Sequence, residues 1–139
     1  MGAWGEGAFD NDGAADWSLE FRNADLAAGL RLITDALSAV AEADAAAYLD
    51  ANDGERAVAA AELVALINGQ PIDESPYNQT ARQWIVRVHP SSDRSLTNLA
   101  RQTVARVTGQ TSELAELWDE TGSASWRSAM SGLRDKLDA

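Results

Sequence analysis

The feature of this sequence that most constrains its fold is a stripe of large apolar residues that recurs every three or four positions. Leu26, Leu30, Ile33, Leu37 and Val40 follow one another at spacings of 4, 3, 4 and 3. Residues at these spacings share one face of an α-helix, since the helix completes a turn every ~3.6 residues. The stripe therefore predicts a long helix over about residues 24–50, with this face buried in a core.

The same periodicity predicts a helix on either side of the stripe. A short helix is expected at about residues 13–22, with Asp12 as its N-cap and with Trp17 and Phe21 on one face. Asn-Asp-Gly at 52–54 is a turn signal, and an alanine-rich helix is expected to follow it. Because alanine side chains are small, we expect this helix to pack closely against the stripe as an antiparallel hairpin.

The second half of the chain begins with a proline-containing segment. Pro71 and Pro76 disfavour a helix across residues 69–77, which are expected to form a loop between two helical halves. Four more helices are expected after it. They are one at 78–88 stopped by His89-Pro90, one capped by Ser91 or Ser92 and closed by Gly109, one capped by Ser112, and one carrying Trp126, Met130, Leu133 and Leu137.

These elements together predict the fold class. No stretch alternates convincingly between apolar and polar residues, so strands are not expected. The chain of 139 residues is expected to form a single all-α domain, residues 1–139, built as a compact bundle of about seven helices. Residues 1–12 are expected to form an extended N-terminal arm docked on that bundle.

The opening stretch, MGAWGEGAFDNDGAADW, combines aromatic rings, glycines and acids in an unusual density. One interpretation is structural: Trp4 and Phe9 pin the arm to the bundle, each ring contributing about 2–3 kcal/mol when buried, while Asp10 or Asp12 caps the first helix. The other interpretation is a recognition surface beside a groove. Its candidate binding residues are Trp4, Phe9, Asp10, Asn11, Asp12, Asp16 and Trp17.

This stretch resembles a bacterial family catalogued as domain of unknown function 4259, whose members begin with Met-Gly-Ala-Trp-Gly and continue to Phe, an acid, Asn-Asp and a later Asp-Trp. Here Ala8 stands where the family usually has proline, and Gly13 where a polar residue is common. The similarity continues in Ala-Ala-Glu-Leu-Val-Ala at 60–65 and in the Ser-Glu-Leu and Leu-Trp-Asp-Glu runs of 112–120. The resemblance implies no activity.

The charge of the chain is strongly acidic and unevenly distributed. The formal net charge is −11, and residues 1–55 hold twelve acids against two arginines. Such a surface repels phosphates, so we expect no nucleic-acid partner and instead a basic protein partner. The longest apolar run, residues 57–67, is interrupted by Glu62 and is too short to span a membrane, so no membrane association is expected.

Motifs for catalysis and for cofactors are missing from the sequence. There is no cysteine, and His89 is the one histidine, so neither a thiolate nucleophile nor a His–His zinc site is available. Neither a P-loop, a dinucleotide fingerprint nor a calcium-binding EF-hand loop occurs. We therefore predict no catalytic residue, no metal site and no cofactor. The lack of cysteine also fits a cytoplasmic location.

Two arginines are candidates for an anion site. Arg94 and Arg101 lie seven residues apart on one predicted helix, and Arg82 and Arg87 precede them. A set of guanidinium groups can hold a phosphate or a carboxylate ligand. The alternative is that these arginines meet the acidic first and second helices within the fold.

The sequence predicts a small acidic binding protein rather than an identified enzyme. The first hypothesis is a non-enzymatic protein-binding or regulatory module, similar in role to an immunity protein or an antitoxin, that acts on a basic protein. The alternative is a small-molecule-binding or hydrolytic enzyme that uses carboxylates, with or without a divalent cation. The oligomeric state is not indicated by the sequence.

Overall fold

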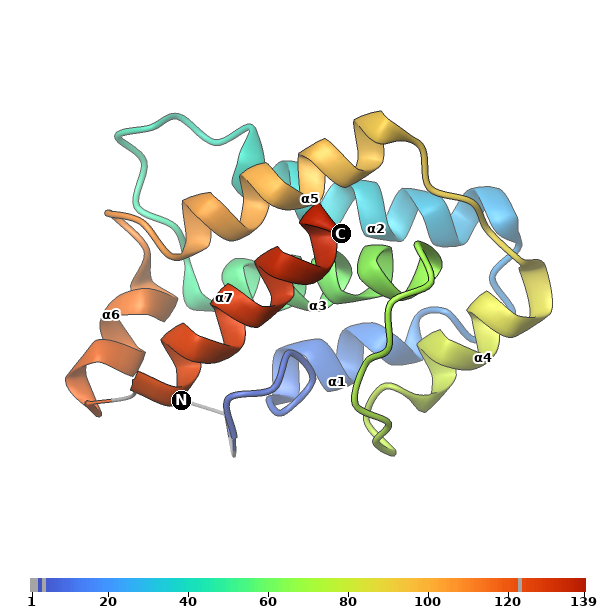
Figure 1. Cartoon of the computed structure of the whole chain (residues 1–139), viewed down its shortest axis with the longest axis horizontal. Coiled ribbons are helices and arrows are strands. Elements are labelled where there is room, and N and C mark those ends of the chain that lie inside the picture. The colour runs from blue at the N-terminus through green and yellow to red at the C-terminus, as the bar shows by residue number, and fades with distance from the viewer. Residues whose placement is uncertain (1–2, 4, 123) are drawn as a thin grey trace.

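The computed structural model describes residues 3, 5–122 and 124–139, and within these ranges it holds seven helices and no strand (Figure 1). The all-α prediction is therefore confirmed. The helices are α1 (Asp12–Leu19), α2 (Leu26–Ala41), α3 (Ala51–Ile67), α4 (Gln79–Val88), α5 (Arg94–Val107), α6 (Glu113–Glu120) and α7 (Ala124–Asp138).

Helix α3 is the centre of the bundle. It packs against α1, α2, α5, α6 and α7, and more sparsely against α4. Residues 57–61 of α3 are all buried, and four of these five are alanines, which allow neighbouring helices to approach closely. Helices α2 and α3 run antiparallel, as expected (Figure 1). The stripe on α2 is buried at Ile33, Leu37 and Val40, whereas Leu26 at the start of the helix is exposed.

Helix α2 is shorter than its sequence predicts, since it ends at Ala41 rather than near residue 50. Beyond Ala41 the chain is held by contacts with a distant segment. Leu49 N–H donates to the carbonyl of Thr111, and Arg106 donates to the carbonyl of Ala47. These tertiary contacts outweigh the helix propensity of the alanines in residues 43–47. The local sequence does not reveal them, so it predicts a helix that is too long.

The expected turn at 52–54 is also wrong. These residues form the first turn of α3, because Asp50 accepts hydrogen bonds from the N–H groups of Asn52 and Asp53 at 2.8 and 3.2 Å. Gly54 then packs against Leu114 of α6, where an added Cβ would lie 3.4 Å from the leucine side chain. Asn-Asp-Gly therefore lies in the first turn of helix α3 here, and its glycine allows close packing against α6.

Two of the predicted caps are shifted by a residue or two. The N-cap of α1 is Asn11 rather than Asp12, and its side chain accepts from Ala14 N–H at 2.7 Å. The cap of α5 is Asp93 rather than Ser91 or Ser92, and it accepts from Leu96 N–H at 2.8 Å. Ser112 caps α6 as predicted.

The ends of the helices explain where the loops lie. Gly69 follows α3 with φ of +92°, and His89 ends α4 with φ of +49°, so both take the left-handed conformation that stops a helix. The predicted loop at 69–77 is present between α3 and α4. Among the described residues, no helix is both long enough and apolar enough to cross a membrane.

The described part of the N-terminal segment forms a closed loop, whereas the sequence predicted an extended arm. Ala3 pairs with Asn11 in an isolated antiparallel bridge, and Asp10 N–H donates to the carbonyl of Gly7 at 3.0 Å. Phe9 is buried, and Trp4 lies outside the described residues. We call residues 5–10 the N-terminal loop.

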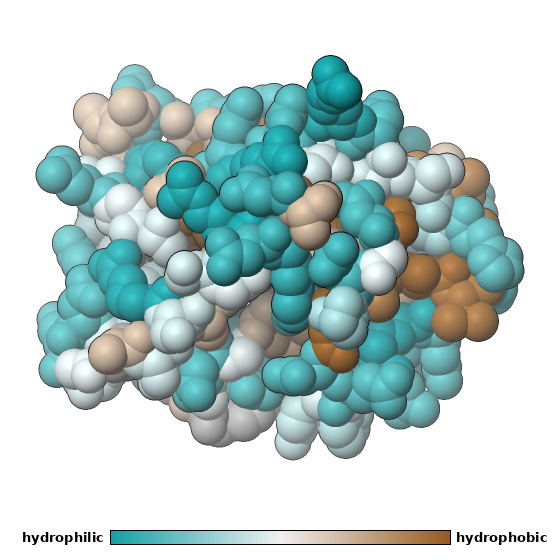
Figure 2. Space-filling model, viewed as in Figure 1, coloured by the Kyte–Doolittle hydropathy of each residue, from teal (hydrophilic) through white to brown (hydrophobic). Residues whose placement is uncertain are grey.

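The surface is mostly polar on the face shown in Figure 2, with apolar residues gathered toward its right-hand side. Among the described residues, the large apolar side chains with the most exposure are Leu19, Leu26, Tyr48, Tyr77 and Val86.

Candidate functional site

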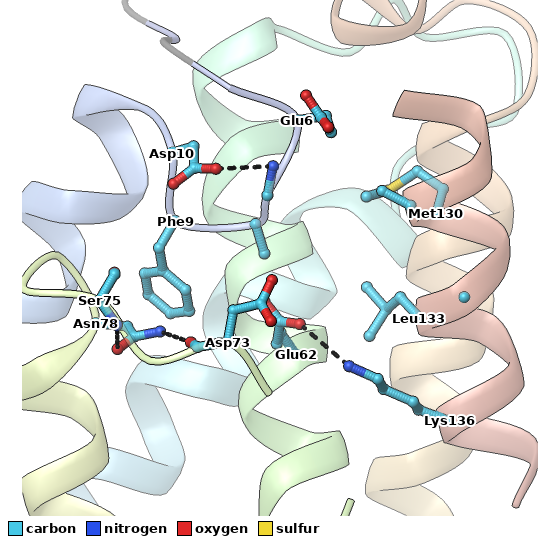
Figure 3. A pocket seen from close by; sticks show the side chains of 14 residues that line it. Glu6, Phe9, Asp10, Glu62, Asp73, Ser75, Asn78, Met130, Leu133 and Lys136 are labelled. Atoms are coloured by element: carbon cyan, nitrogen blue, oxygen red, sulfur yellow. Dashed lines mark hydrogen bonds and ion pairs between the residues drawn. The ribbon is translucent and has the colours of Figure 1, made fainter. Parts of the chain in front are cut away.

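A pocket of about 260 Å³ opens where the N-terminal loop, α3, the segment 69–78 and α7 meet (Figure 3). We call it the acidic pocket. Its charged lining residues are Glu6, Asp10, Glu62, Asp73 and Lys136, and its large apolar lining residues are Phe9, Met130 and Leu133. Four carboxylates and one ammonium group, together with these apolar side chains, therefore line the acidic pocket.

The N-terminal loop brings Phe9 and Asp10 to the pocket through a tight turn. Gly7 N–H donates to Asp10 Oδ2 at 3.1 Å, which holds the carboxylate over the loop. A Cβ on Gly7 would lie 2.6 Å from the same oxygen, so glycine allows this close approach. The loop thereby fixes Asp10 at the rim and the Phe9 ring beneath it.

Asn78 organises the opposite wall. Its side chain donates to the carbonyl of Asp73 at 2.7 Å and accepts from Ser75 N–H at 3.2 Å. Arg82 Nε donates to Asn78 Oδ1 at 2.6 Å and so orients the amide. Asp73 is itself exposed, and the buried Asn78 holds its backbone carbonyl at this wall of the pocket.

Glu62 is the most perturbed group of the pocket. Its side chain is 16 % exposed, and its Oε1 lies 3.9 Å from Lys136 Nζ. Burial raises the pKa of Glu62 to about 7, with smaller contributions from the charges of Asp73 and Asp10, although Lys136 opposes them. A single ammonium at this distance therefore leaves the carboxylate incompletely neutralised.

A second buried carboxylate lies behind the N-terminal loop. Glu55 of α3 is 5 % exposed and accepts a hydrogen bond from the backbone of Gly13 near the start of α1. Burial, followed by the charge of Asp12, raises the pKa of Glu55. This residue fastens α1 to α3 and belongs to the packing behind the loop, not to the lining of the acidic pocket.

The candidate residues named from the sequence are only partly brought together. Phe9 and Asp10 line the acidic pocket. Asn11 is buried as a helix cap, Trp17 is buried against Phe21 with ring centroids 5.0 Å apart, and Asp12 and Asp16 are exposed along α1. Trp4 lies outside the described residues.

The two arginines proposed for an anion site lie in different environments. Arg101 pairs with Asp138 at 2.8 Å and donates to the carbonyl of Leu137 at 2.9 Å, which ties α5 to the end of α7. Arg94 is exposed at the start of α5. The described contacts of Arg101 are internal, and an anion site at this pair stays a prediction.

The alternative interpretation placed four arginines against the acidic first and second helices, and of these Arg87 reaches the loop between α1 and α2. Arg106, which was not among them, reaches the loop after α2. Arg87 donates to the carbonyl of Ala24 at 2.8 Å, and Arg106 donates to the carbonyl of Ala47 at 2.6 Å. The guanidinium groups thus satisfy backbone carbonyls in the loops that follow α1 and α2. Among the residues that the structure describes, neither guanidinium forms an ion pair with a carboxylate of those helices.

Glu62, Asp73 and Lys136 are pocket residues that the sequence reasoning missed. Glu62 had a detectable signal, since it is the one charge within the apolar run of residues 57–67. A lone carboxylate on a buried helix face indicates either a partner or a function. Asp73 and Lys136 carried no such signal, because only the fold brings their segments to Glu62.

Among the residues that the structure describes, no group of three or more histidine, aspartate and glutamate side chains is placed to hold a metal ion. The carboxylates that line the acidic pocket can bind a cationic group. Glu62, whose pKa is raised to about 7, can also exchange a proton near neutral pH.

Comparison with known proteins identifies a family. The family model described as a domain of unknown function, DUF4259, matches residues 2–129 of the chain. Comparisons with curated proteins and with solved structures gave no match.

Proposed function

Because this chain belongs to the DUF4259 family, whose description names no activity, we propose its function from the site: a binding module whose acidic pocket takes a cationic side chain of a basic protein. The observation that carries the proposal is the imbalance of four carboxylates and one ammonium in a pocket of about 260 Å³. The role is non-enzymatic and regulatory, like that of an immunity protein or antitoxin, in the bacterial cytoplasm.

The shape and chemistry of the pocket suit an arginine or a lysine. Phe9, Met130 and Leu133 offer apolar and aromatic contact to the methylene stem of such a side chain. Glu62 and Asp73 supply acceptors for the charged head, and an aromatic ring nearby adds attraction to a cation. The net charge of −11 would steer a basic protein toward the chain before the pocket is filled.

The proposal is tested with a pentapeptide that carries one arginine among alanines, and with its citrulline analogue as the neutral control. Met130 is the only methionine besides Met1, so ¹³C-methyl-methionine labelling places an NMR probe in the pocket wall. We expect the arginine peptide, and not the citrulline peptide, to shift the Met130 signal, with affinity that falls as salt is added.

Matched double variants locate the binding. The pair E62Q and D73N removes two pocket carboxylates, whereas D12N and D16N remove two exposed carboxylates of α1. Because the lost charges touch the ligand only in the first pair, we expect it to weaken binding about tenfold and the second pair at most about twofold. Equal weakening by both pairs, or no shift of Met130 in the wild type, would refute the proposal.

One observation favours a second candidate function, an enzyme that uses Glu62 as general acid or base. A carboxyl group whose pKa is raised to about 7 can both give and accept a proton near neutral pH. A thermal-shift screen of nucleotides and of Mg²⁺, Mn²⁺ and Ca²⁺ tests this candidate. It is supported by a compound that raises the melting temperature of the wild type and is turned over by it but not by E62Q, and it is contradicted when no compound does so.

A further inference from the structure

Lys136 already holds the position that the proposed function assigns to a partner's cation. Its ammonium reaches from α7 across the pocket toward Glu62 of α3, as the dashed line in Figure 3 shows. Lys136 is also the only lysine of the chain, since the other ten basic residues are arginines. The pocket thus contains a cation of the same class as the proposed ligand.

The contact of Lys136 with Glu62 is weaker than the contact that Arg127 of the same helix makes with Asp119. Arg127 holds Asp119 through Nε and an Nη group at 3.3 and 2.8 Å, a two-point contact. Lys136 has a single ammonium group, whose Nζ lies 3.9 Å from Glu62 Oε1, and its side chain remains 32 % exposed. An ammonium on a flexible stem is released from a carboxylate more easily than a planar guanidinium held at two points.

The helix also leaves the lysine room to move. Gly132 lies one turn before Lys136 on the same face of α7, and both line the pocket. An added Cβ on Gly132 would meet nothing within 4 Å, so the space above it is open. The Lys136 side chain can therefore swing away from Glu62 without repacking the core.

We propose that Lys136 is an internal competitor for the acidic pocket, and this inference rests on the proposed function. An arginine or lysine of the partner protein must displace the Lys136 ammonium from Glu62 in order to bind. The lysine keeps the empty pocket partly neutralised and lowers the affinity for weakly cationic ligands. A partner that presents its side chain with good geometry replaces the ammonium, and Lys136 moves toward the open space over Gly132.

The test compares K136Q with R134Q, because each variant removes one positive charge from α7 and Arg134 is exposed and does not line the pocket. The probe is the single-arginine pentapeptide, titrated at low salt and followed through Met130. With the competitor gone, K136Q is expected to bind the peptide about fivefold more tightly than R134Q does.

The outcomes separate this inference from the function on which it depends. If K136Q binds no more tightly than R134Q while the wild type binds and E62Q with D73N does not, only the competitor role is overturned. If neither the wild type nor any variant binds the peptide, the proposed function fails and the competitor role fails with it. Reductive methylation with ¹³C-formaldehyde adds a second readout, because the dimethyl signal of Lys136 must shift when the peptide displaces it.

Discussion

Trp84 of α4 lies so close to Gly29 of α2 that an added Cβ on the glycine would be 2.1 Å from Cε2 of the indole. The same indole donates from Nε1 to the carbonyl of Asp25 at 3.1 Å, which is the carbonyl of the N-cap of α2. Trp84 is fully buried and also contacts Phe21, with ring centroids 5.0 Å apart. This ring therefore attaches α4 to the rest of the bundle.

Gly29→Ala should destabilise the fold by about 1–3 kcal/mol, because the new methyl group overlaps a buried ring that has little room to retreat. The matched control is Gly132→Ala on α7, where the added Cβ meets nothing within 4 Å. There the higher helix propensity of alanine should stabilise the protein by up to about 1 kcal/mol. Urea denaturation of both variants measures the difference, and a Gly29→Ala variant as stable as the wild type would contradict the packing.

Asn11→Ala should cost about 1–2 kcal/mol, because it removes the N-cap of α1. The substitution also removes the bond from Asn11 Nδ2 to the carbonyl of Ala8 at 3.3 Å, which closes the N-terminal loop. Asp12→Ala changes an exposed residue within the first turn and should cost about 0.5 kcal/mol or less through the helix dipole. Thermal denaturation compares the stabilities of the two variants. A larger loss of stability in Asp12→Ala than in Asn11→Ala would indicate that Asp12 is the N-cap of α1.

The fold could be predicted from the sequence wherever the spacing of apolar residues within one helix indicates which face is buried. The periodic positions Ile33, Leu37 and Val40 are buried as the stripe requires, and Trp126, Met130, Leu133 and Leu137 are buried on α7. Caps were harder, because Asn, Asp and Ser are all good caps, and the choice depends on where the incoming chain turns.

The candidate site was largely beyond sequence reasoning, because four segments build it: the N-terminal loop, α3, the segment 69–78 and α7. Phe9 and Asp10 were named from a local motif, whereas Glu62, Asp73 and Lys136 meet only through the packing of α3 and α7 and the course of the loop between α3 and α4. The end of α2 shows the same limit. Its alanines favour helix locally, but the pairing of Leu49 with Thr111 ends it.

Glu62→Gln should change how stability depends on pH. The pKa of Glu62 is raised from 4.5 to about 7 in the folded protein, so folding favours its protonated form. In the wild type this contribution is fully present below pH 4.5 and is lost as the pH rises toward and through 7. Glutamine does not titrate, so the variant should gain up to about 3 kcal/mol relative to the wild type between pH 4 and pH 8.

Denaturant titrations of both proteins at several pH values measure that gain. Asp35→Asn is the control, because Asp35 is an exposed carboxylate on α2 outside the acidic pocket. If the free energies of unfolding of the wild type and Glu62→Gln changed in parallel with pH across this range, Glu62 would titrate like a free carboxylate. That result would contradict the effect expected from its burial.

Phe9→Ala should destabilise the protein by about 3–5 kcal/mol, because the ring is 3 % exposed and its removal leaves a cavity beneath the N-terminal loop. Phe9→Leu retains most of the apolar volume and should cost about 1–2 kcal/mol. Because the ring also lines the acidic pocket, the alanine variant should shift the Met130 methyl signal even without a ligand. Urea denaturation with the ¹³C-methionine spectrum checks both effects. A Phe9→Ala variant with wild-type stability and an unchanged Met130 signal would mean that the loop does not hold the pocket wall in solution, and that residues 69–78, α3 and α7 define the acidic pocket without it.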